Sequence, residues 1–363
     1  MAKSVLSDAH FHDEKAALAF VEARIWANGV SCPHCGNADE AKIGKLSGSS
    51  TRMGVRKCYA CRKPFTVKVG TIFESSHVPL HLWLQAIFLM SSSKKGISTQ
   101  QLKRTLGVAM KTAWFMGHRI REAMREGGLG PLGGAGQTVE ADETYFGSKA
   151  KENRREVRKE TGQPYKHRTR ISDKRAVLGL IERGGKVRTF HVAQATKENV
   201  AKLVTENVHQ ESALMTDESR LYTGMDAIFA SHDTTRHSAG EYVREGGIHS
   251  NTIESYFSVF KRGMRGVYQH CDEKHLHRYL AEFDFRHNNR VALGAVRHQL
   301  AATGRRSTAP SGRTKSPKAQ ATEPDKEQSE RFMETARKLG ADGKGPEFMR
   351  ALDTILPPKS GPK

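Results

Sequence analysis

Residues 249–290 read HSNTIESYFSVFKRGMRGVYQHCDEKHLHRYLAEFDFRHNNR, and the first part of this stretch has the periodicity of a helix. Its apolar stripe, at spacings of four and three, consists of Ile253, Phe257 and Phe260, and is widened by Tyr256. A second face, at spacings of three, four and three, carries Asn251, Glu254, Ser258 and Lys261. A solvated helix face has the same pattern, so a functional meaning for Glu254 depends on residues elsewhere in the chain.

Two aspartates upstream each belong to a strand-like run. Asp142 lies in TVEADETYFG, residues 138–147, and Asp217 closes SALMTD, residues 212–217. Two strands and a helix that each deliver one carboxylate form an oxygen-ligand site suited to two Mg²⁺ ions, with Mn²⁺ as an alternative metal. Glu140 and Glu143 flank Asp142, and both are expected on the opposite face of the strand.

Four of the five cysteines form two CxxC pairs, within CPHCG at residues 32–36 and CYAC at residues 58–61. Two such pairs at this separation predict a tetrahedral zinc site of the ribbon type, with the ligands Cys32, Cys35, Cys58 and Cys61. The alternative is two pairs of redox-active thiols, which the sequence favours less. His34 is not needed as a ligand, and Cys271 is a buried or idle thiol.

These motifs together resemble the DDE transposases of bacterial insertion sequences, in the group with an N-terminal zinc ribbon. The resemblance is carried by VEADETYFG around Asp142, by HSNTIE ending at Glu254, by KRG beginning at Lys261, and by the paired CxxC motifs. It covers about residues 10–295. Several separate motifs in the right order make it specific.

The resemblance implies an α/β fold: an RNase H-like catalytic domain preceded by a small zinc ribbon and a helical unit. It implies that Asp142, Asp217 and Glu254 hold two Mg²⁺ ions, with Lys261 near a DNA phosphate and Asn251 in a supporting position. The implied activity is cleavage at the element ends followed by strand transfer into target DNA. The implied partner is double-stranded DNA, bound by a homodimer or higher oligomer.

The charge of the chain agrees with a polyanionic partner. It carries 59 Lys and Arg against 39 Asp and Glu, a net charge of +20, with pI near 9.8. The longest strongly apolar run, residues 82–90, is interrupted by Gln85 and is too short to span a bilayer. No secretory signal is recognisable, and the cysteine usage suits a reducing compartment, so a cytoplasmic location is predicted.

Two regions are candidates for contacts with DNA. Residues 98–125 predict two helices across a turn at Gly107, and either a helix-turn-helix or an ordinary helical packing unit fits them equally. The polar residues of its second helix that would read DNA are Lys111, Thr112, His118 and Arg119. The basic run 149–175 is expected to clamp phosphates, with the residues Arg154, Arg155, Arg158 and Lys159.

Changes of composition divide the chain into six segments. They are an N-terminal helix and zinc ribbon (10–70), a helical DNA-binding unit (78–126), a glycine-rich hinge (127–136), the RNase H-like domain (137–295), a disordered linker (303–330) and a small helical tail (331–363). Residues 332–356 have enough apolar spacing for two small helices, whose role the resemblance does not cover.

Two other functional classes stay open. A zinc-ribbon regulator without catalysis would leave the three spaced carboxylates unexplained, whereas a structure-selective nuclease of the same fold would use them for hydrolysis without joining. The third metal ligand also has competitors, because Asp233, Glu241 and Glu245 precede Glu254. Glu254 is preferred because it alone combines a helical setting, an aromatic stripe beside it and Lys261 two turns later.

Overall fold

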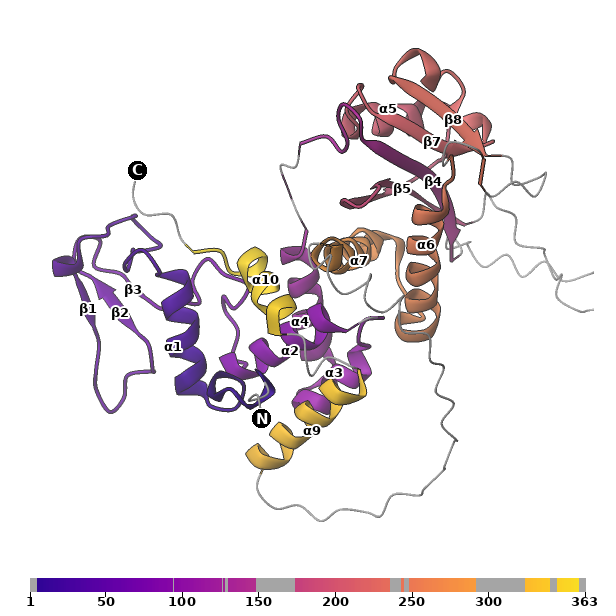
Figure 1. Cartoon of the computed structure of the whole chain (residues 1–363). Coiled ribbons are helices and arrows are strands. Elements are labelled where there is room, and N and C mark those ends of the chain that lie inside the picture. The colour runs from indigo at the N-terminus through magenta and orange to yellow at the C-terminus, as the bar shows by residue number, and fades with distance from the viewer. Residues whose placement is uncertain are drawn as a thin grey trace, which may run out of the picture. The chain divides into compact units, whose positions relative to one another are not determined.

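The computed structural model of the chain (Figure 1) forms two compact units. It describes residues 5–93, 95–125, 127, 130–147, 174–235, 243–244, 248–291, 324–339 and 345–358. The first unit combines Met1–Arg125 with Ala292–Lys363, and we call it the ribbon–helix unit. The second unit, Glu126–Val291, is called the sheet unit. The sheet unit is therefore an insertion between two parts of the ribbon–helix unit.

The ribbon–helix unit begins with short turns and one amphipathic helix, α1 (Glu14–Ile25). Asp13 caps this helix: its Oδ2 accepts a hydrogen bond from the backbone N–H of Ala16 at 2.7 Å. A small antiparallel sheet follows, made of β1 (Ile43–Lys45), β2 (Arg56–Cys58) and β3 (Pro64–Phe65). Arg56 binds Glu22 of α1 and stacks on Trp26, which fastens the ribbon to α1.

Three helices come next: α2 (Leu80–Ser92), α3 (Thr99–Leu106) and α4 (Met110–Ala123). A capping box starts α3, because Ser98 and Gln101 exchange side-chain and backbone hydrogen bonds. Gly107 ends α3 with φ +68°, a conformation that favours glycine. Nearly every residue of α2 is buried, which explains why its sequence is apolar on all sides.

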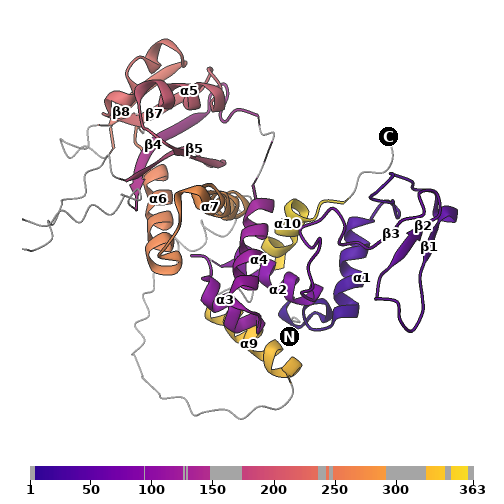
Figure 2. The same cartoon turned by 180° about the vertical axis from the view of Figure 1, so that it is seen from behind.

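The C-terminal helices α9 (Pro324–Lys338) and α10 (Gly345–Ile355) complete the core of this unit. Both views show them beside α2, α3 and α4 (Figures 1 and 2). Helix α9 contacts α3, and α10 contacts α2 and α4. Four phenylalanines with at most 1% exposure meet there, at ring-centroid distances of 5.0 to 5.9 Å: Phe11, Phe88, Phe332 and Phe348. The tail is thus part of the N-terminal core.

The linker predicted over residues 303–330 needs a correction, because α9 already begins at Pro324. Proline suits the first turn of a helix, and Gln328 is held by a partner that the local sequence cannot show. The amides of Gln85 and Gln328 bind each other, with Nε2···Oε1 distances of 2.6 and 3.3 Å. Residues 303–323 lie outside the described part of the chain.

The sheet unit contains a mixed sheet in the order β6-β5-β4-β7-β8. Its strands are β4 (Thr138–Phe146), β5 (Arg175–Glu182), β6 (Val187–Val192), β7 (Ala213–Asp217) and β8 (Ser231–Thr235). The first three are antiparallel neighbours, while β7 runs parallel to β4 and β8 parallel to β7. This topology confirms the predicted α/β, RNase H-like fold.

Helices cover both faces of this sheet (Figure 1). Helix α5 (Lys197–Asn207) packs on one face through Val200 and Val204. Helices α6 (Asn251–Gly263) and α7 (Leu276–Val291) pack on the other face, where the predicted stripe Ile253, Phe257 and Phe260 is buried. A π-helical turn, Met264–Tyr268, follows α6 directly.

A glycine allows α6 to approach the sheet closely. Gly179 of β5 pairs with Asp142 of β4, and a Cβ atom at Gly179 would lie 2.7 Å from atoms of both Ile253 and Phe257. Any larger residue would push α6 away from the strands. The close approach brings Glu254, on the same turn of α6, next to the strand that carries Asp142.

The glycine-rich segment 127–136, predicted as a hinge, packs into the sheet unit in its second half. Leu132 is 4% exposed and belongs to the core under α5. Its backbone N–H donates to Asn207 O at 2.8 Å, and its carbonyl accepts from the N–H of His209 at 2.9 Å. Residues from 130 onward are therefore part of the sheet unit.

Within the described residues, no helix combines the length and the apolar character needed to cross a bilayer.

Candidate active site and metal centre

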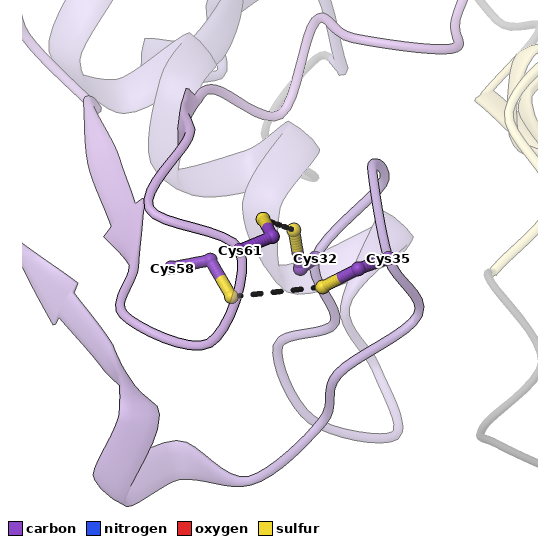
Figure 3. A group of neighbouring side chains, drawn as sticks. All are labelled: Cys32, Cys35, Cys58 and Cys61. Carbon is purple, nitrogen blue, oxygen red and sulfur yellow. Dashed lines mark hydrogen bonds between the residues drawn. The ribbon is translucent and has the colours of Figure 1, made fainter.

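The four predicted zinc ligands converge in the ribbon (Figure 3). All four sulfur atoms lie within 4.8 Å of one another, and the Sγ–Sγ distances are 3.7 Å for Cys32–Cys61 and for Cys35–Cys58. A tetrahedron with Zn–S bonds of about 2.3 Å has edges of about 3.8 Å, so the residues fit a zinc ion. The cysteines form a structural zinc site. His34 Nε2 lies 3.3 Å from Pro64 O and takes no part in the cluster.

We expect Cys32→Ser to release the zinc and unfold the ribbon, because three short strands bury too little apolar surface to stay folded without the metal. Elemental analysis of protein purified without chelators should give one zinc per wild-type chain and none per variant chain. Cys271→Ser is the matched control, since that thiol lies in the sheet unit and should leave the zinc content unchanged. Wild-type protein that folds without stoichiometric zinc would contradict this expectation.

The three predicted carboxylates come from three elements of the sheet unit. Asp142 lies in the middle of β4, Asp217 is the last residue of β7, and Glu254 lies in the first turn of α6. Because β4 and β7 are parallel neighbours, Asp217, at the carboxyl end of β7, lies beside the strand that carries Asp142. Asp217 Oδ1 accepts a hydrogen bond from Ser219 N at 3.0 Å.

The pKa of Asp142 shows that these acids are close to one another. Burial raises the pKa of this carboxyl from the ordinary value of 3.8 to about 8, and the negative charges of Asp217, Glu143 and Glu254 add to the rise. Burial likewise raises the pKa of Glu143, with Asp217 again contributing. A divalent cation would relieve this concentration of negative charge, so the carboxylates fit a hard metal ion.

A pocket of about 790 Å³ opens beside these acids. One part of its lining is acidic, with Asp142, Glu143 and Glu254. Another part is basic, with Lys261, Arg262 and Arg265 from the end of α6 and the turn after it. The predicted face Glu254, Ser258 and Lys261 thus lines the pocket. A pocket with acidic and basic parts can hold metal ions and a phosphate chain together.

Two predicted residues stand outside this lining. Asp217 does not line the pocket, although its charge is felt by Asp142 and Glu143. Asn251 is the exposed first residue of α6 and does not line the pocket either. Among the described residues, the four cysteines are the only group of three or more Asp, Glu, His or Cys side chains whose ligand atoms lie close enough to share one metal ion. The three carboxylates therefore lie near one another, but their oxygen atoms are not all close enough to share one ion.

The prediction for Glu140 was wrong, whereas Glu143 faces as expected. Side chains two positions apart share a strand face, so Glu140 lies with Asp142 on the side of α6. Its carboxylate is fully buried and accepts hydrogen bonds from the first turn of α6. Glu143 also contributes to the pocket lining, but its carboxylate is bound on the α5 side by Tyr222 Oη at 2.8 Å and Ser219 Oγ at 3.2 Å.

The raised pKa of Asp142 predicts that removing its charge stabilises the metal-free protein. The folded state holds this proton up to about pH 8, whereas the unfolded chain releases it near 3.8. The free energy of unfolding of the metal-free protein therefore decreases as the pH rises from about 4 to about 8. In EDTA at pH 8, Asp142→Asn should increase the free energy of unfolding of the sheet unit by on the order of 2–5 kcal/mol.

Calorimetric scans at pH 5 and pH 8 measure this difference, and the stabilising effect of Asp142→Asn should shrink at pH 5. Asp233→Asn on β8 is the control in the same sheet, because Asp233 lies away from the described lining of the pocket. A destabilised Asp142→Asn variant at pH 8 would show that the site does not concentrate negative charge.

The residues predicted to contact DNA divide into three groups: one that is exposed, two that are buried or bound within the protein, and four that lie outside the described residues. Lys111 is exposed near the start of α4. His118 is 4% exposed, which removes it as a reader of DNA. Arg119 donates to the carbonyls of Ile72 at 2.9 Å and Glu74 at 2.6 Å, so its guanidinium holds the segment before α2 against α4. The third group, Arg154, Arg155, Arg158 and Lys159, lies outside the described residues.

The competing candidates for the third acid are also placed in part. Asp233 lies within β8 and pairs with Met215, away from the described lining of the pocket. Glu241 and Glu245 lie outside the described residues. Of the described candidates, Glu254 is the acid that lines the pocket and contributes to the raised pKa of Asp142.

Comparisons with known proteins match both halves of this arrangement. A family model described as a transposase zinc-ribbon domain matches residues 12–64, and one described as an ISXO2-like transposase domain matches residues 131–288. An uncharacterized protein in transposable element ISH50 of Halobacterium salinarum is 30% identical over 283 residues, covering 76% of this chain and 91% of that protein. The first range contains the four cysteines, and the second contains the three carboxylates.

Proposed function

This chain belongs to the insertion-sequence transposases with a zinc ribbon and an ISXO2-like transposase domain, and from that premise we propose that it catalyses Mg²⁺-dependent DNA cleavage and strand transfer at the ends of its element. The observation that carries the proposal is the pocket that Asp142 and Glu254 line together with basic residues, and the raised pKa of Asp142 supports it. This raised pKa reflects buried acids held together beside the pocket.

In the proposed site, Asp142, Asp217 and Glu254 would hold two Mg²⁺ ions. The negative charges of Asp217 and Glu254 both raise the pKa of Asp142, so the three carboxylates would act together on a bound cation. When bound, the ions would activate a water or a DNA 3′-OH and stabilise the leaving oxygen of an in-line displacement at phosphorus. Three carboxylates would be enough to hold the two ions, because Mg²⁺ in such sites keeps only one or two protein carboxylates and several waters.

The basic side of the pocket would hold the DNA strand. Lys261, Arg262 and Arg265 supply positive charge within the same pocket, and their contacts with phosphates would orient the bond to be cut. The net charge of +20 would attract both the element ends and the target duplex. In the proposal the active form is a dimer or higher oligomer on DNA, and the basic run 149–175 adds phosphate contacts.

A joining assay tests this function. Full-length protein is incubated with Mg²⁺, a labelled fragment carrying the ends of its own element, and a supercoiled plasmid. Labelled plasmid is the expected product, and EDTA should prevent it. Cleaved fragment without joined product would identify a nuclease of the same fold. End binding with neither product in Mg²⁺ or Mn²⁺ would identify a non-catalytic DNA-binding regulator.

A further inference from the structure

The fully buried carboxylate of Glu140 lies at the junction of β4 and α6. It accepts hydrogen bonds from the backbone N–H groups of Thr252 at 2.9 Å and Ile253 at 3.1 Å. The hydroxyl of Thr252 donates to the same carboxylate at 2.9 Å. Glu140 therefore receives three hydrogen bonds from two consecutive residues of the first turn of α6.

These bonds replace an ordinary helix cap. The side chain of Ser250, at the N-cap position of α6, makes no capping hydrogen bond. The free N–H groups of a first helical turn favour a negative charge, and here a strand supplies it. The capping carboxylate is 112 residues from Thr252 in the sequence, so the cap also joins two separate elements.

The charge of Glu140 is itself balanced by a cation. Arg183 donates from Nε to Glu140 Oε1 at 2.7 Å and from Nη2 to the carbonyl of His249 at 2.7 Å. The imidazole Nδ1 of His249 lies 3.2 Å from Glu140 Oε1. Arg183 thus binds both Glu140 and the backbone just before α6, which fixes the entry of the chain into the helix.

This junction of β4 and α6 lies close to the proposed metal site. Glu140 is two residues from Asp142 on β4, and Thr252 is two residues from Glu254 on α6. We propose that Glu140, held by Arg183, is a positioning residue that fixes the distance between Asp142 and Glu254 and so sets the affinity of the site for divalent metal. This inference rests on the proposed function, and Glu140 itself is not a metal ligand in it.

Metal binding requires that the ligands Asp142 and Glu254 be held at a fixed distance from each other. Active-site groups need placement to within roughly 0.5 Å, and partners behind the ligands commonly change metal affinity or activity by about 10–100-fold when removed. The apolar contacts of Ile253 and Phe257 at Gly179 hold α6 against the sheet. They do not fix its position along its own axis, whereas hydrogen bonds from its first turn do.

The test compares Glu140→Gln and Glu140→Ala with a matched control, Glu282→Gln, in the full-length protein. Glu282 is also fully buried in the sheet unit and is paired with Arg286 and Tyr268, but it lies on α7. Three properties are measured: Mn²⁺ binding by paramagnetic resonance, hydrogen exchange of the amides of Thr252 and Ile253, and the Mg²⁺ concentration for half-maximal cleavage.

For Glu140→Ala we expect Mn²⁺ affinity to fall and the Mg²⁺ requirement to rise, each by about 10–100-fold. Exchange of the two α6 amides should accelerate at least about tenfold, while binding of element ends stays unchanged. Glu140→Gln keeps an acceptor of the same shape without the charge, so it should be intermediate and should remain folded. Glu282→Gln should leave metal binding unchanged.

Wild-type metal affinity and amide exchange in both Glu140 variants would overturn the inference. An equal loss of metal affinity in Glu282→Gln would overturn it too, because it would indicate general loosening of the sheet unit. A wild-type protein that binds Mn²⁺ but does not cleave DNA would contradict the proposed function instead. In that case metal binding and amide exchange would still decide the role of Glu140.

Discussion

A Glu254→Gln variant should bind element ends like the wild type and yet lose cleavage and joining by on the order of 1,000-fold, which corresponds to about 4 kcal/mol of transition-state stabilisation. Glutamine has almost the same size as glutamate, so packing of α6 on the sheet should survive. It lacks the charge that offsets a divalent ion. Gel-shift titration measures the binding, and the joining assay measures the chemistry.

Asn251→Ala is the comparison on the same helix. Asn251 is exposed and does not line the pocket, so its loss should lower the rate of joining without abolishing it. An inactive Asn251→Ala variant, together with wild-type joining by Glu254→Gln in Mg²⁺, would reverse the assignment of the third ligand.

Several structural features follow from local sequence signals. Asp13 caps α1, and Ser98 with Gln101 forms the capping box of α3, because the partners lie within one turn. The hairpin of β5 and β6 joins two β-rich runs across Gly184 and Gly185, where few conformations connect the strands. Such features depend on residues close in sequence, so one chain is sufficient to recognise them.

The sequence does not reveal the roles of residues whose partners are distant in the chain. The role of Glu140 depends on α6, 112 residues later, and its sequence neighbours show only another acid in an acidic run. Gln85 looks like an interruption of an apolar helix until Gln328, 243 residues away, supplies its partner. A buried polar side chain is stabilised only when its hydrogen bonds are made, and the sequence does not reveal which partner makes them.

The site itself was predicted in outline. The spacing of Glu254, Ser258 and Lys261 placed them on one helix face, and that face does line the pocket. Arg262 and Arg265 were not predicted as part of it. Arg262 follows Lys261 directly within α6, whereas Arg265 lies in the π-helical turn after α6, which a regular 3.6-residue period does not describe.

The C-terminal helices should prove essential for the stability of the N-terminal unit. Phe332 of α9 is fully buried and packs against Phe11 and Phe88, at ring-centroid distances of 5.3 and 5.9 Å. Phe332→Ala should therefore destabilise the ribbon–helix unit by about 3–5 kcal/mol, through lost apolar burial and the cavity that remains. A chain that stops after residue 323 would lose both α9 and α10, and this unit should then no longer unfold cooperatively.

Met349→Ala is the matched control, because this side chain lies on α10 and is 42% exposed. Its effect on the free energy of unfolding should stay within about 0.5 kcal/mol. The sheet unit has its own hydrophobic clusters on both faces of its sheet, so its unfolding transition should persist in all three variants. Hydrogen exchange by mass spectrometry separates the two units, since each peptide reports on one of them. Unchanged protection of α2 and α3 in the shortened chain would mean that the tail only covers a core that is stable without it.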